Sequence, residues 1–198
     1  LGVCPLFDVR GAELVASVAC GWWLLAYFVL WAYPCRLPTS FVMISGTITL
    51  LPAWFLLVHL HGSDRQGPLV VLVLIAIIWA ADIGAYFFGR KFGRIKLAIK
   101  ISPAKTWEGV IGGLILAAVV ALLASIALNI SSAAFVSIAL AAAIASVVGD
   151  LTISMLKRYA GLKDSGWLLP GHGGVLDRID SVSAAVPFFF FGIQVVGI

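Results

Sequence analysis

The chain has 198 residues, of which 62% are hydrophobic and 11% are charged, and its formal net charge is +4. In an ordinary soluble domain roughly 25% of residues are charged, so this composition and a mean hydropathy of +1.11 exclude that class. The cysteines Cys4, Cys20 and Cys35 form no CxxC pair, and they indicate neither a disulfide framework nor a zinc site. We therefore expect an integral membrane protein.

Apolar runs predict an all-α polytopic protein with about six transmembrane helices, forming a single membrane domain over residues 1–198. Each run has about 20 residues, which as a helix is long enough to cross ~30 Å of hydrocarbon. Only helices are expected, because the runs lack the alternation of a β-barrel and every backbone polar group must be hydrogen-bonded inside lipid. The expected spans are residues 14–33, 41–60, 69–88, 110–128, 133–151 and 182–198.

The connections between these spans differ in charge. The connections after the first, third and fifth spans carry eleven of the thirteen Lys and Arg residues, and the others are Arg10 and Arg65. The positive-inside rule places the charged connections in the cytoplasm. We expect the active-site loops in two of them, over residues 89–109 and 152–181.

Two acidic residues lie where lipid should exclude them. Asp82 falls inside the third span, and because a charge at that depth is costly it usually faces a polar cavity and marks function. The alternative is an aspartate paired with a basic neighbour for packing. Asp150 ends the fifth span, where it would oppose the helix macrodipole, and Ser154, Lys157 and Arg158 follow it on one helix face. That polar stripe is also compatible with a solvated helix end.

The glycine-rich segment before the sixth span combines several groups that bind phosphate or metal. Gly173 and Gly174 would allow the backbone to approach a phosphate closely. Asp177 and Asp180 are three residues apart, can face the same way, and offer the oxygen ligands that Mg²⁺ prefers. His172 could bind or protonate a phosphate oxygen, although a histidine by itself is more often structural.

The segment before the fourth span has a helix-start signal among lysines. Ser102 is the expected N-cap and Pro103 the first helical residue, so that Lys105 would lie beside an anion-binding helix N-terminus. The alternative is a positive-inside anchor with Trp107 at the membrane interface, which would leave Glu108 unexplained.

Three glycines at the start of the fourth span, Gly109, Gly112 and Gly113, favour close helix packing over ligand contact. We interpret Lys96 as a topology charge. The remaining polar clusters together predict one cytoplasmic-face site, with carboxylates for metal and cations for phosphates. That combination favours Mg²⁺-dependent phosphoryl or nucleotidyl transfer between a soluble nucleotide and a phosphorylated lipid.

Several of these motifs together resemble the phosphatidate cytidylyltransferase (CDP-diacylglycerol synthase) family of bacterial type. They are SMLKR at residues 154–158, KD at 163–164, LPGHGG at 169–174 and DRID at 177–180, with ADIGAY at 81–86, continuing through Gly89 and Arg90, and SPAKTWEG at 102–109 upstream. The resemblance extends roughly from Trp79 to the C-terminus. Members of the family usually begin with further apolar helices, so we expect this chain to be truncated at its N-terminus.

The resemblance implies a reaction of phospholipid biosynthesis, in which CMP is transferred from CTP to phosphatidic acid to give CDP-diacylglycerol and pyrophosphate. It implies Mg²⁺ and a second, monovalent cation such as K⁺, and it allows a homodimer in the lipid bilayer without a nucleic-acid partner. It also implies a multi-pass protein of the bacterial inner (cytoplasmic) membrane with its active site facing the cytoplasm.

The resemblance further implies roles for individual residues, assigned here by position. The expected catalytic residues are Asp150, Asp177, Lys157 and Arg158. The expected metal ligands are Asp82, Asp150, Asp177 and Asp180. The expected substrate-binding residues are Ser102, Lys105, Thr106, Ser154, Lys163, Asp164, His172, Gly173, Gly174 and Arg178.

Two alternatives remain at this point. One is a related CTP-dependent enzyme, such as a polyprenol kinase or another lipid cytidylyltransferase, which a panel of lipid substrates would separate. The other is a transporter with Asp82 and Asp150 on an ion path. The transporter is disfavoured because the charges gather at one face and no internal repeat is visible.

Overall fold

The computed structural model describes residues 9–34, 38–63, 66–162, 165, 174 and 176–196, and only the backbone of residues 39, 177 and 178. Within these ranges there are six helices that are long and apolar enough to cross a membrane, which confirms the predicted all-α polytopic class. The helices are α1 (Val9–Ala32), α2 (Thr39–Gly62), α3 (Gly67–Phe92), α4 (Trp107–Leu128), α5 (Ser132–Tyr159) and α6 (Leu176–Val196). A short hairpin of strands β1 (Lys96–Ala98) and β2 (Ser102–Thr106) precedes α4.

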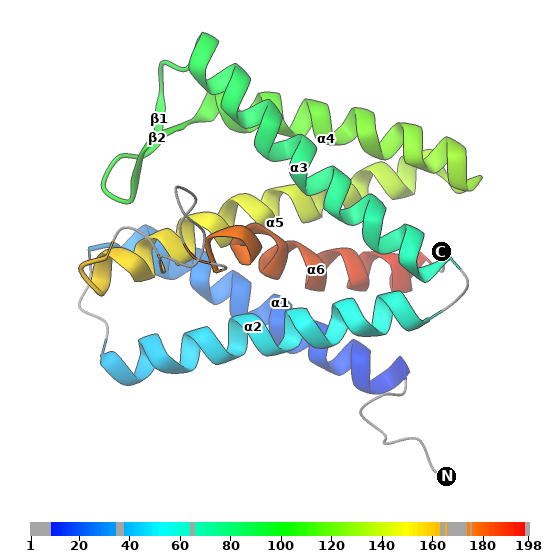
Figure 1. Ribbon diagram of the computed structural model, residues 1–198, viewed down its shortest axis with the longest axis horizontal. Coiled ribbons are helices and arrows are strands. Elements are labelled where there is room, and N and C mark those ends of the chain that lie inside the picture. Colours follow the sequence, from blue (N-terminus) through cyan, green and yellow to red (C-terminus); the bar gives the residue numbers. More distant parts are fainter. Residues whose placement is uncertain are drawn as a thin grey trace.

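Consecutive helices run in opposite directions, and α6 lies at the centre of the bundle (Figure 1). It packs against α1, α2, α3 and α5, and it fully buries Ala184, Ala185, Phe189 and Phe190. The helices α3 and α4 lie together on one side of α5 and α6, while α1 and α2 lie on the other (Figure 1). Helices α3 and α5 end, and α4 and α6 begin, at the same end of the bundle, which we call the basic end.

Glycines allow α3 and α4 to approach each other at backbone distance. A Cβ atom added to Gly113 of α4 would lie 2.5 Å from the carbonyl oxygen of Ala81 in α3, and one added to Gly109 would lie 2.8 Å from that of Ala85. From the other side, a Cβ on Gly84 would lie 2.7 Å from the carbonyl oxygen of Gly112. The predicted packing role of the α4 glycines is therefore confirmed.

The segment before α4 is an antiparallel β-hairpin, so the predicted helix start at Ser102 and Pro103 is wrong. Ser102 pairs with Ala98 and Thr106 pairs with Lys96, with an irregular register between these pairs. Proline has no N–H to donate to a ladder but is accepted at sheet edges and bulges, which suits Pro103 here. The helix instead begins at Trp107, where the Thr106 hydroxyl accepts a hydrogen bond from the Gly109 N–H at 3.2 Å.

Two helices extend further into the basic end than their apolar runs. Helix α3 continues to Phe92 and α5 continues to Tyr159, so the expected loops begin later than predicted. The placement of Asp150 at a helix end is wrong as well, because it lies more than two turns before the last residue of α5. The apolar runs from which the spans were predicted end at the first charged residues, whereas the helices continue for further amphipathic turns.

The close contact between α3 and α4 predicts a specific sensitivity to a single methyl group. Gly113→Ala should lower the free energy of unfolding by about 1–3 kcal/mol, because the new Cβ meets backbone atoms, which cannot rotate away as a side chain could. Gly46→Ala in α2 is the matched control, since a Cβ there meets nothing within 4 Å. Thermal unfolding in detergent measures both, and equal stability of the two variants would contradict the packing interpretation.

Candidate active site

A cavity of about 890 Å³ opens at the basic end, and residues from four helices and the hairpin line it. Helix α3 contributes Asp82, α5 contributes Asp150 and Lys157, α6 contributes Asp180, and β2 contributes Lys105. Three carboxylates and two ammonium groups that are far apart in the sequence therefore share one space. This grouping was predicted from the sequence, and the described part of the chain brings it together.

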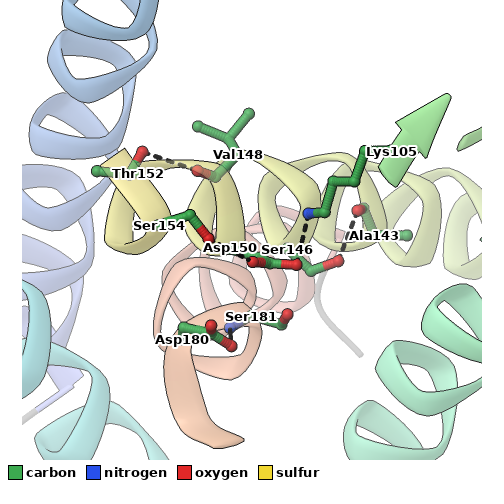
Figure 2. A network of polar contacts seen from close by, with 9 residues as sticks. All are labelled: Lys105, Ala143, Ser146, Val148, Asp150, Thr152, Ser154, Asp180 and Ser181. Carbon is green, nitrogen blue, oxygen red and sulfur yellow. Dashed lines mark hydrogen bonds and ion pairs between the residues drawn. The ribbon is translucent and has the colours of Figure 1, made fainter. Parts of the chain in front are cut away.

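An ion pair between Lys105 and Asp150 joins the hairpin to α5 inside the cavity. The Lys105 Nζ atom lies 2.5 Å from the Asp150 Oδ2 atom, and both side chains are partly exposed. The Ser154 hydroxyl donates to the other oxygen of the Asp150 carboxylate at 3.2 Å. Figure 2 shows Lys105 reaching from β2 toward the Asp150 carboxylate on α5.

The hairpin that carries Lys105 is fixed at both ends. At its tip, Ile101 is buried against Leu151 and Met155 of α5. At its base, both carboxylate oxygens of Glu108 accept the Ile95 N–H, at 3.1 and 3.2 Å. Glu108, which a topology role did not explain, therefore holds the hairpin against α4.

Helix α6 comes close enough to α5 to place Asp180 beside Asp150, and a glycine makes this possible. A Cβ on Gly149 would lie 2.6 Å from the Ala184 Cβ atom and 2.7 Å from the Asp180 carbonyl oxygen. Asp180 is buried, and its Oδ1 atom accepts the Ser181 N–H at 2.7 Å (Figure 2). Gly149 therefore sets the spacing between the two helices at the carboxylates.

Asp150 is the electrostatic centre of the carboxylates. Its charge repels both Asp82 and Asp180, whereas Lys105 attracts both, and Lys157 also attracts Asp180. Because this repulsion acts in a partly desolvated space, it is stronger than in water. The cavity can therefore take up additional positive charge near Asp150.

The other predicted site residues fall into three groups. Thr106 lines the cavity as the buried N-cap of α4, and Ser154 reaches the site through Asp150. Ser102, Arg158 and Gly174 are not among the residues that line the cavity. Outside the described residues or side chains lie Lys163, Asp164, His172, Gly173, Asp177 and Arg178.

Four polar residues in the lining were absent from the predicted site: Tyr86, Arg90, Lys96 and Ser181. Tyr86 and Arg90 follow Asp82 at intervals of four residues on α3, so helical spacing was the signal that pointed to them. Lys96 begins β1 and lines the cavity, so interpreting it as a topology charge alone is wrong. The hairpin that brings it there was not predicted.

The carboxylates offer oxygen donors, which suit a hard cation such as Mg²⁺. Among the residues whose side chains are described, however, no three His, Cys, Asp or Glu groups lie close enough together to hold a metal ion. Mg²⁺ commonly takes only one or two protein carboxylates and completes its shell with substrate phosphates and water. The donor chemistry fits such a site at Asp150, and the side chain of Asp177 lies outside the part of the chain that the structure describes.

The chain belongs to the cytidylyltransferase family, whose model matches residues 6–196. The phosphatidate cytidylyltransferase of Haemophilus influenzae is 42% identical over 90% of this chain and 68% of its own length. That of Pseudomonas aeruginosa is 44% identical over 92% of this chain and 69% of its own length. That of Bacillus subtilis is 40% identical over 68% of this chain and 51% of its own length.

The Lys105–Asp150 pair predicts energetic coupling between two distant segments. In a double-mutant cycle, Lys105→Gln and Asp150→Asn should show a coupling energy of about 0.5–1 kcal/mol, the range for partly exposed pairs. Thermal unfolding in detergent measures the cycle. Lys100→Gln at the hairpin turn is the control and should not couple to Asp150→Asn, because Lys100 does not line the cavity. Additive effects of Lys105→Gln and Asp150→Asn would contradict the pairing.

Proposed function

We propose that this chain is a phosphatidate cytidylyltransferase that transfers CMP from CTP to phosphatidic acid, releasing pyrophosphate and forming CDP-diacylglycerol. The main support for this proposal is the cavity at the basic end, where carboxylates and cations lie together within a membrane-spanning bundle. The family membership and the names of the similar bacterial proteins support the choice of substrates.

In the proposed reaction, a phosphate oxygen of phosphatidic acid attacks the α-phosphorus of CTP. A new P–O bond forms, the bond from the α-phosphorus to the bridging oxygen breaks, and pyrophosphate leaves with that electron pair. The attacking phosphate monoester is largely ionised near neutral pH because its second pKa is about 6. Its attacking oxygen needs no proton removed before attack, so the proposed reaction does not require a dedicated general base.

The main obstacle to this reaction is charge, because both substrates are polyanions. Lys96, Lys105 and Lys157 line the cavity and would offset the repulsion as the substrates approach each other. Lys105 is held on a fixed hairpin, so its ammonium group is positioned before substrate arrives. Such preorganised charge stabilises a transition state without reorganisation of the protein.

We also propose that the reaction uses Mg²⁺, held by Asp150 with Asp177, Asp180 and Asp82 as further candidates. The bound ion would neutralise charge on the triphosphate and polarise it toward attack. A second cation such as K⁺ is part of the same proposal. The repulsion that Asp150 exerts on its neighbouring carboxylates supports cation binding at this position.

The proposed orientation places the basic end in the cytoplasm of a bacterial inner membrane. Arg90, Lys91, Arg94, Lys96 and Lys100 lie at this end, and among the described residues Arg10 lies at the other. The positive-inside rule supports this orientation. It would give the cavity direct access to cytoplasmic CTP.

The first test is pyrophosphate release by the purified chain in detergent micelles. Release should require both CTP and phosphatidic acid, should stop when EDTA removes divalent cations, and should return when Mg²⁺ is added in excess. Pyrophosphate formed with CTP alone would contradict the proposed lipid acceptor, and activity undiminished by EDTA would contradict the metal requirement.

The central position of Asp150 predicts that it is essential for this activity. Asp150→Asn should lower kcat by ~10²-fold or more, because it removes the charge around which the cations are arranged. Glu13→Gln is the matched control, since Glu13 is exposed on α1 and does not line the cavity. Comparable activity of the two folded variants would contradict the assigned role of Asp150.

A further inference from the structure

Helix α3 forms a polar stripe along one wall of the cavity. Asp82, Tyr86 and Arg90 line the cavity and are spaced four residues apart, so they follow one another along one face of the helix. The Arg90 Nη1 atom donates a hydrogen bond to the Tyr86 hydroxyl oxygen at 2.9 Å. This contact holds the guanidinium group against the wall of the cavity, and its remaining N–H groups are available to an anion.

A second stripe on α3, next to the first, is apolar and does not line the cavity. Ile83 is 51% exposed and Phe87 is 62% exposed. Exposed apolar side chains on a membrane-spanning helix face hydrocarbon. Helix α3 is therefore a boundary with the polar cavity on one side and lipid on the adjacent side.

The length of α3 places Arg90 at the depth of lipid headgroups. The helix has 26 residues, which at ~1.5 Å per residue exceeds the ~30 Å thickness of the hydrocarbon. Its last turn holds Arg90 and Lys91, with the Lys91 Nζ atom 5.3 Å from the centre of the Phe92 ring. Trp107, at the adjacent start of α4, is 51% exposed, as expected for an interfacial aromatic residue. Asp82 lies about 12 Å deeper along the helix axis.

We propose that Arg90, held by Tyr86, binds the phosphate monoester of the lipid substrate, and that the acyl chains lie along the Ile83 and Phe87 stripe. This inference rests on the proposed function and adds the position of the lipid within the site. A guanidinium presents a planar fork of donors that matches a phosphate, and it keeps its charge at any physiological pH. A phosphate at Arg90 stays at headgroup depth, so the lipid enters the cavity from the side without leaving the bilayer.

The nucleotide has different requirements, which separates the two substrates. CTP is polar and enters from water, so it gains no binding energy from an exposed apolar stripe. Lys105 and Lys157, on β2 and α5, line the part of the cavity next to Asp150, and the triphosphate would contact them there. The two polyanions would then approach from opposite walls, with the lipid phosphate on α3 and the triphosphate on α5.

The test is a KM comparison for Arg90→Gln in mixed micelles, varying phosphatidic acid at saturating CTP and then the reverse. The expected result is a rise of about tenfold or more in the KM for phosphatidic acid, the size of a lost charged hydrogen-bond pair. The KM for CTP and the kcat should stay within about twofold of wild type, because the triphosphate contacts other residues.

Three further variants sharpen the comparison. Lys91→Gln removes the same charge from the neighbouring residue, which does not line the cavity, and it should leave both KM values unchanged. Arg90→Lys should give an intermediate KM for phosphatidic acid, because an ammonium group keeps the charge but not the fork. Tyr86→Phe should raise the same KM by a smaller factor, since it removes only the hydroxyl that holds Arg90.

A binding measurement makes the inference independent of turnover. Without CTP, the purified wild-type protein should bind a fluorescent phosphatidic acid about tenfold or more tightly than the Arg90→Gln variant does. The two proteins should bind fluorescent phosphatidylcholine with equal affinity. Unchanged phosphatidic acid binding in a folded Arg90→Gln variant would overturn the inference, as would a rise in the KM for CTP in place of that for lipid. An inactive wild type that still shows this difference in binding would count against the proposed reaction and not against the lipid site.

Discussion

The burial of the cavity carboxylates, together with their mutual repulsion, is the constraint on which the rest of this structure depends. Asp150 acts unfavourably on both Asp82 and Asp180, in a cavity that lies within a membrane-spanning bundle. Such an arrangement is stable only if cations are supplied at the same place. Lys105 meets Asp150 directly, and Lys157 acts on Asp180 from α5. The cluster is thus prepared for a reaction in which positive charge must be gathered around phosphates.

The β-hairpin positions Lys105 in the cavity. It is too small to be stable by itself, since an isolated two-stranded sheet is marginal in water. Burial of Ile101 against α5 and the hydrogen bonds from the Ile95 N–H to Glu108 attach it to two different helices. A lysine on a flexible loop would lose more conformational freedom on meeting a carboxylate or a phosphate. Attachment at both ends removes most of that cost before any substrate binds.

The sequence predicted most of the fold because lipid leaves few alternatives. Long apolar runs must be helices, and Asp82, Asp150 and Asp180 had to meet in a polar space because lipid penalises them individually. The hairpin could not be predicted in the same way. Ser102 and Pro103 form a good helix start by local rules, whereas the contact of Ile101 with α5 and the hydrogen bonds from the Ile95 N–H to Glu108 favour the hairpin. Tyr86 and Arg90 lie in a segment that resembles the family, but only their spacing of four residues from Asp82 on a helix that continues past residue 88 places them in the cavity.

The glycine contacts between α3 and α4 have a mechanical consequence. With Gly113 and Gly109 against the carbonyl groups of Ala81 and Ala85, the two backbones are in close contact, and a side chain at either glycine would force the helices apart. Gly149 joins α5 to α6 at Asp180 in a comparable way. The far ends of α4 and α5 are tied by the hydrogen bond from the Ser125 hydroxyl to the Ser132 hydroxyl. The cavity therefore lies between two closely packed helical pairs, α3 with α4 and α5 with α6.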